Sequence, residues 1–130
     1  MNLNFDPTRP IYIQIMKEIK KRAVRGQYQA GTQLPSIREM AKEMAVNPNT
    51  IARVYMELER EGFIVTRRGH GSFITDESGK VEGERRKLAD EATERFLNEI
   101  MDIELNGGHR GKLIDIISDK LSEKQRKIIE

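Results

Sequence analysis

The chain has 130 residues, enough for one domain with a small appendage. It is 37% hydrophobic and 34% charged, which predicts a soluble, helix-rich protein with a modest core. It has no cysteine and only 2 histidines, so disulfides and thiolate metal sites are excluded and we expect no metal or other cofactor. No apolar run approaches the roughly 18 residues of a membrane span, and no signal peptide is visible at the start. We expect a cytoplasmic protein without a membrane partner.

The net charge of +2 is unevenly spread. Residues 1–75 contain 12 Lys and Arg against 7 Asp and Glu, a net of +5, whereas residues 76–130 contain 11 against 14, a net of −3. A solvated surface would explain this basic half. An anionic partner for it is the alternative.

Residues 10–25 are expected to form the first helix. Pro10 suits a first helical turn, and Ile11, Ile15, Ile19 and Ala23 recur every four positions.

The second helix should begin after Ser36. Ser36 and Glu39 have the spacing of a capping box, in which each side chain accepts a hydrogen bond from the other residue's backbone N–H. The expected buried face consists of Ile37, Met40, Ala41 and Met44.

A third helix is predicted over residues 48–61, because Asn47 suits an N-cap and Pro48 the first helical position. Its apolar positions have the spacing i, i+3, i+4, i+7. They are Ile51, Val54, Tyr55 and Leu58.

Two short strands follow, at residues 63–66 and 72–75, both rich in β-branched and aromatic side chains. They predict a β-hairpin with a glycine-rich tip over residues 67–71. The tip carries Arg67, Arg68, Gly69 and His70.

The rest of the chain is expected to be helical. Residues 77–83 resemble a polar linker between a domain at 1–76 and a helical region at 84–130. We predict helices over residues 84–105 and 112–121, with an end at residues 106–108, and a last helix that Ser122 caps. Their apolar positions, which we assign to dimerisation, are Leu88, Ala92, Phe96, Ile100, Ile103, Leu113 and Ile117.

The predicted fold class is mainly α with a small β-hairpin: a winged helix-turn-helix followed by a short all-helical dimerisation region. The third helix would enter the DNA major groove with its first residues at the base edges. Asn, Arg and Thr there have donors and acceptors that suit bases or phosphates, although an ordinary polar outer face would look the same. With Ser36 and Arg38 from the second helix and the tip, the expected DNA-binding set is Ser36, Arg38, Asn47, Asn49, Thr50, Arg53, Arg67, Arg68, Gly69 and His70.

Two members of this set have simpler explanations. Arg38 could be a surface residue paired with Glu39 or Glu43, and His70 could be a turn residue without a function. A catalytic histidine needs a partner, and no nucleophile–base pair stands out, so we do not expect an enzyme.

The residues in these elements resemble the GntR family of bacterial transcription regulators. Residues 34–41, LPSIREMA, are similar to its LPSxRxLA signature. Residues 47–55, NPNTIARVY, with 58–62, LEREG, resemble its recognition helix, and residues 67–74, RRGHGSFI, resemble its wing, RxGxGTFV. The resemblance covers about residues 8–75 in order and spacing.

The resemblance implies a dimeric repressor that binds a partly palindromic operator in double-stranded DNA and is released by an effector, of which the residues themselves say nothing. It assigns DNA contacts to Arg38, Asn47, Asn49, Thr50, Arg68 and Gly69. Many members have arginine at the positions of Pro48 and Ala52, whereas here the charge is at Arg53. The short helical C-terminal region resembles the YtrA subfamily, in which such helices form the dimer and which often governs membrane-transporter operons.

Two alternatives stay open at this point. The winged helix could instead be a protein-interaction module whose basic face docks an acidic partner. The long C-terminal helix could fold back on its own winged domain, although we favour burial against a second copy of the chain.

Overall fold

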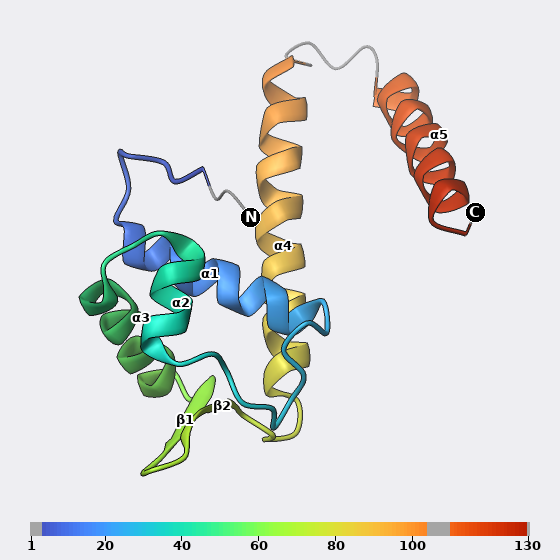
Figure 1. Cartoon of the computed structure of the whole chain (residues 1–130). Coiled ribbons are helices and arrows are strands. Elements are labelled where there is room, and N and C mark those ends of the chain that lie inside the picture. The colour runs from blue at the N-terminus through green and yellow to red at the C-terminus, as the bar shows by residue number, and fades with distance from the viewer. Residues whose placement is uncertain (1–3, 104–109, 130) are drawn as a thin grey trace. The chain divides into compact units, whose positions relative to one another are not determined.

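The computed structural model describes residues 4–103 and 110–129 (Figure 1). The chain divides into two compact units, Met1–Ala89 and Asp90–Glu130. The first contains α1 (Ile11–Val24), α2 (Ile37–Met44), α3 (Pro48–Arg60), β1 (Ile64–Arg67), β2 (Gly71–Ile74) and the start of α4 (Lys80–Ile103). The second contains the rest of α4 and α5 (Arg110–Ile129).

The core of the first unit lies where α1 and α2 pack against α3. The predicted apolar face of α3 is buried throughout, from Ile51 to Leu58. The predicted faces of α1 and α2 are confirmed except at their first residues, because Ile11 is 41% and Ile37 38% exposed. Each is the first residue of its helix, at the edge of the core, where fewer neighbours are available to cover it.

Local signals set the ends of α2 and α3 as the sequence predicts. The capping box at Ser36 and Glu39 is complete, and the Asn47 side chain caps α3, with Pro48 in its first turn. Between these helices the chain turns through Ala45, which has left-handed backbone angles (φ 56°, ψ 47°) although it is not glycine.

The wing is an antiparallel hairpin in which Ile64 pairs with Ile74 and Arg67 with Gly71. Arg67 and Gly71 were expected in the tip but are the last and first residues of the strands, so the tip is the turn 68–70. The reason is that the strand pairing continues until a β-turn closes, with the His70 N–H donating to the Arg67 carbonyl at 2.9 Å.

The expected linker over residues 77–83 is wrong in part, because α4 begins at Lys80. Val81 packs against the core of the winged unit, and the Arg85 guanidinium donates to the Val24 carbonyl at the end of α1, at 2.6 Å. Lys20 pairs with Glu84 at 3.5 Å. The local sequence of this polar stretch predicts a linker, but tertiary contacts stabilise it as a helix.

In the second unit, α5 is one helix from Arg110 to Ile129, so Ser122 does not begin a new helix. Good helix formers surround Ser122, and a cap requires a break that the backbone does not make. The predicted helix end at residues 106–108 lies outside the described residues. Within the described ranges, no helix is both long and apolar enough to cross a membrane.

Candidate nucleic-acid interface

The start of α3 presents polar side chains on the side opposite its buried face. Asn49 and Arg53 are exposed and Thr50 is half-buried. The Asn47 side-chain Oδ1 accepts from the Asn49 backbone N–H at 2.8 Å. The side-chain NH₂ of Asn47 donates to no residue that the structure describes, so it is available to a ligand. The first N–H groups and the positive end of the helix dipole favour an anion at this end of α3.

Arg53 is held by an aromatic side chain from α1. Its guanidinium lies over the ring of Tyr12, 3.7 Å from the ring centre. The two residues line a hollow of about 660 Å³ together with Asn49 and Thr50. The structure therefore brings three of the predicted DNA-binding residues together with Tyr12, which sequence analysis did not select.

At the start of α2, the acidic neighbours of Arg38 are engaged elsewhere. Glu39 accepts from the Ser36 backbone N–H at 3.0 Å, and this bond, with a smaller effect from the Ser36 hydroxyl, holds the pKa of Glu39 below its ordinary value. Glu43 pairs at 2.9 Å with Arg22, which is only 1% exposed. Within the described parts of the chain Arg38 has no ion pair, so the pairing proposed as its simpler explanation is not formed.

The two arginines of the wing differ in their surroundings. The Arg67 guanidinium lies over the Phe73 ring, 4.9 Å from its centre. Arg68 is exposed in the tip and forms no ion pair with any residue the structure describes. Gly69 has φ +80°, a conformation that side-chain-bearing residues rarely adopt, and His70 is exposed beside it.

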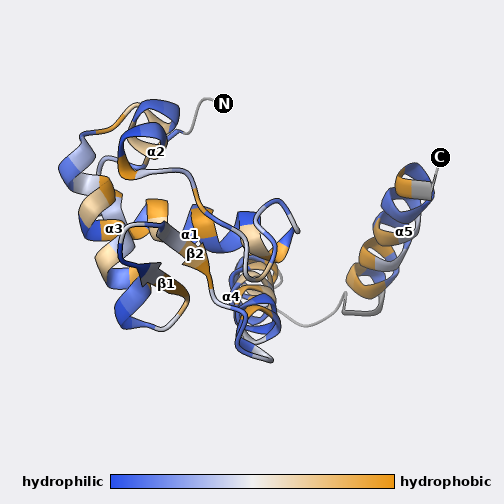
Figure 2. Ribbon diagram, turned by 60° about the horizontal axis from the view of Figure 1, so that its bottom comes forward, coloured by the Kyte–Doolittle hydropathy of each residue, from blue (hydrophilic) through white to orange (hydrophobic). Residues whose placement is uncertain are grey.

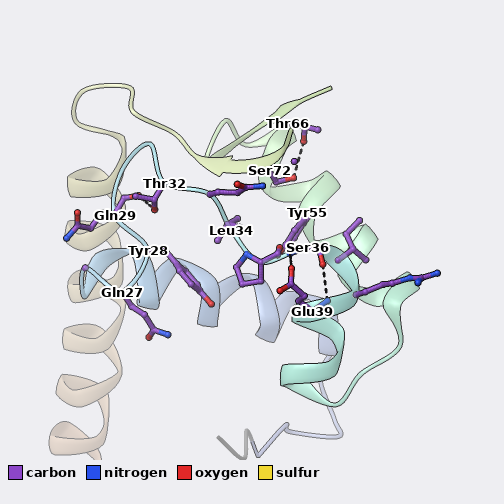
Figure 3. A pocket seen from close by; sticks show the side chains of 16 residues that line it. Gln27, Tyr28, Gln29, Thr32, Leu34, Ser36, Glu39, Tyr55, Thr66 and Ser72 are labelled. Carbon is purple, nitrogen blue, oxygen red and sulfur yellow. Dashed lines mark hydrogen bonds between the residues drawn. The ribbon is translucent and has the colours of Figure 1, made fainter. Parts of the chain in front are cut away.

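A larger hollow of about 1040 Å³ lies between the wing, the start of α2 and the loop before it (Figure 3). Ser36 and Arg38 line it from α2, and Thr66 and Ser72 line it from the strands of the wing. At its base the buried Tyr55 hydroxyl donates to the Pro35 carbonyl at 2.6 Å, and burial raises the pKa of this phenol. The hollow is thus lined by hydroxyl groups, the Arg38 guanidinium and the Glu39 carboxylate. Its hydroxyl groups and Arg38 are donors of the kind that bind a phosphate backbone.

Sequence analysis did not select four residues that lie beside the candidate interface. They are Tyr12, Gln33, Thr66 and Ser72. Tyr12 is the second residue of α1, and nothing in its local sequence indicates contact with α3. Gln33 lies in the loop before α2, where it reads as an ordinary polar loop residue. Only the packing of distant segments reveals these residues.

The residues assigned to dimerisation lie on α4 and α5. Figure 2 shows hydrophobic and hydrophilic residues intermixed along α5. Several of the assigned residues are exposed within this chain, including Phe96 at 41% and Ile103 at 76%. Ala92 is also exposed, and the half-buried members are Leu88, Ile100, Leu113 and Ile117.

The helices α2 and α3 form a helix-turn-helix, α3 exposes a polar face, and an arginine-bearing wing follows. These features define the class of winged-helix DNA-binding transcriptional regulators. The family model described as bacterial regulatory proteins, gntR family, matches residues 11–74. The chain is 43% identical to the HTH-type transcriptional regulator YhcF of Bacillus subtilis (strain 168), over 81% of this chain and 87% of that protein.

It is also 43% identical to the HTH-type transcriptional repressor YtrA of the same organism, over 57% of this chain and 58% of that protein. Among solved structures, a GntR family transcriptional regulator from Listeria monocytogenes superposes with a TM-score of 0.77 and 37% identity, over 88% of this chain and 98% of that one. The chain belongs to the GntR family, and it is a DNA-binding transcriptional regulator rather than an enzyme.

Proposed function

We propose that this regulator is a dimeric repressor that binds a partly palindromic operator. The observation that carries the proposal is the exposed polar start of α3, where Asn49 and Arg53 stand beside a helix end that attracts anions. The B. subtilis relative YtrA is named a repressor, which supports the same role here.

DNA contact would be divided among three elements. The start of α3, with Asn47, Asn49, Thr50 and Arg53, would read base edges in the major groove. Arg38 and Ser36 at the start of α2 would contact the backbone. The tip, with Arg68, Gly69 and His70, and Arg67 beside it would reach the backbone or the minor groove.

The helical region after the winged unit would form the dimer. Its exposed apolar side chains, such as Phe96 and Ile103, support burial against a second copy, because such a stripe is unfavourable in water. A two-fold dimer would present its recognition helices to half-sites about 34–36 Å apart, one turn of DNA.

Two finer points rest on resemblance alone. From the YtrA subfamily, the regulated operon would encode a membrane transporter, and from the GntR family as a whole, a small-molecule effector would release the repressor. Since the ligand is chromosomal DNA, the protein would act in the cytoplasm.

A selection experiment tests this function. The full chain is incubated with a pool of random duplexes, and bound DNA is recovered and sequenced over several rounds. We expect an inverted repeat with half-sites one helical turn apart, and repression of a reporter placed behind it. Recovery of no preferred sequence would overturn operator binding, and activation of the reporter would overturn repression.

A further inference from the structure

The loop before α2 pairs with the wing as an additional extended segment. The Ile74 N–H donates to the Thr32 carbonyl at 2.9 Å, and the Leu34 N–H donates to the Ser72 carbonyl at 2.8 Å. Gln33, between them, forms a bridge with Phe73. Since side chains alternate along an extended segment and Leu34 is buried, Gln33 points to the other side of the pairing.

From this position Gln33 reaches the tip of the wing. Its side-chain Nε2 donates to the His70 carbonyl at 2.6 Å, across 37 positions of sequence. Among the residues that the structure describes, no other side chain donates to the backbone of residues 68–70. Gly71 leaves space for this contact, since a Cβ there would lie 2.7 Å from the Gln33 Nε2.

We propose that Gln33 is a positioning residue that holds the wing tip ready for DNA, an inference that rests on the proposed role of the wing in operator binding. A two-stranded hairpin is marginally stable by itself, so the orientation of its tip requires support from outside. The hydrogen bond to His70 supplies that support next to Arg68 and Gly69. A tip ordered in advance loses less conformational entropy on binding.

A double-mutant cycle with Arg68 tests the proposal in the full chain. Wild type, Gln33→Ala, Arg68→Ala and the double variant are titrated by fluorescence anisotropy. The probe is a labelled duplex that wild type selects from a random pool. Gln33→Ala should weaken binding roughly threefold to tenfold, as expected for the loss of one hydrogen bond. If Gln33 acts through the tip, it should have little further effect once Arg68 is absent.

A positioning role differs from a general structural role in one respect: the loss of affinity caused by Gln33→Ala should depend on the presence of Arg68. Thermal unfolding of the same proteins should show that the effect of Gln33→Ala on the melting temperature is the same with and without Arg68. An equal loss of affinity in both backgrounds would overturn the proposal, as would unchanged binding by Gln33→Ala.

Gln27 supplies the matched control, because it lies in the same loop and its side chain has no hydrogen bond to a described residue. It lines the hollow at the end away from Thr66 and Ser72, and so away from the wing (Figure 3). Gln27→Ala should leave binding unchanged. A second pair, Gln33→Glu and Gln27→Glu, adds one negative charge at either position, but only the first removes the donor to His70. Gln33→Glu should bind more weakly than Gln27→Glu, and equal binding would contradict the proposal. If the wild-type protein selects no sequence from the random pool, the proposed operator binding is contradicted. That result is distinct from a failure of the proposed role of Gln33.

Discussion

The guanidinium of Arg53 on α3 lies against the ring of Tyr12 on α1, 3.7 Å from its centre. A cation over an aromatic ring at this distance is attracted to its negative face. The ring covers one face of the guanidinium, while the N–H groups at its edge can still donate in their plane. α1 thereby restrains the arginine that is expected to read a base.

Replacing Tyr12 should therefore weaken operator binding through Arg53. Tyr12→Leu should reduce affinity by about 0.5–1 kcal/mol, the usual strength of an exposed cation–π contact. Arg53→Ala should reduce it by about 1–3 kcal/mol on the selected sequence and little on scrambled DNA. Anisotropy titrations with both duplexes measure these values. Tyr12→Phe keeps the ring and serves as the control, and an equal loss from Arg53→Ala on both duplexes would remove Arg53 from base readout.

Binding to duplex DNA should weaken steeply with salt, because the first 75 residues have a net charge of +5. A dimer that contacts about 6–10 phosphates should lose about 10³–10⁵ in affinity between about 50 and 200 mM salt. Arg67→Ala should weaken binding to selected and scrambled duplexes alike if Arg67 holds a phosphate. It should lower the slope of log affinity against log salt concentration by about 2, because each copy in the dimer loses one phosphate contact. Arg60→Ala removes the same charge from the far end of α3 and should leave the slope intact. A flat response of wild type to salt would contradict contact with the DNA backbone.

The turn of the helix-turn-helix carries backbone strain at Ala45, where φ is 56°. Left-handed angles cost an L-residue about 1–2 kcal/mol, and glycine avoids this cost. Glycine also adds entropy to the unfolded chain, which offsets part of the gain. Ala45→Gly should therefore raise the free energy of unfolding by up to about 1 kcal/mol, measured by urea denaturation. Ala52→Gly within α3 is the control and should lower it by about 0.5–1 kcal/mol. A clear loss of stability in Ala45→Gly would show that the strain is absent.

The winged unit should need the first turns of α4. A chain that ends at Ala89 keeps Val81 against the core and the bond from Arg85 to Val24, whereas a chain that ends at Ser78 loses both. The longer chain should be more stable by about 1–2 kcal/mol, which thermal unfolding can detect. Val81→Ser in the longer chain should remove most of the difference. Equal stability of the two chains would place the boundary nearer to residue 76, as the sequence first indicated.

Phe96→Asp should dissociate the proposed dimer by placing a charge on its apolar stripe. Loss of linkage between two half-site contacts should lower apparent operator affinity by about 10²–10⁴. Sedimentation gives the mass, and titration with operator DNA gives the affinity. Asn98→Asp adds the same charge to the same helix two positions later and should remain dimeric. A Phe96→Asp variant that stays dimeric would contradict the proposed interface.

The helices of the winged helix and their ends follow from short-range patterns in the sequence. The capping box at Ser36, the Asn47-Pro48 start of α3 and the apolar spacing from Ile51 to Leu58 all appear where predicted. These signals are local, since caps act over three residues and a helical face repeats every three or four. They suffice to place the polar start of α3, and hence the centre of the candidate interface.

The way in which those elements support one another depends on contacts between segments that are distant in the sequence. Two contacts join segments that are far apart in the chain: Tyr12 with Arg53, and Gln33 with His70. The packing of Val81 against the core is a third, and it lies in a stretch that was predicted to be a linker but is helical. No local pattern encodes such pairs, because their energies arise only after the backbone has brought both partners together. The sequence therefore indicates which residues are expected to contact DNA, and the packing of distant segments shows which other residues lie against them.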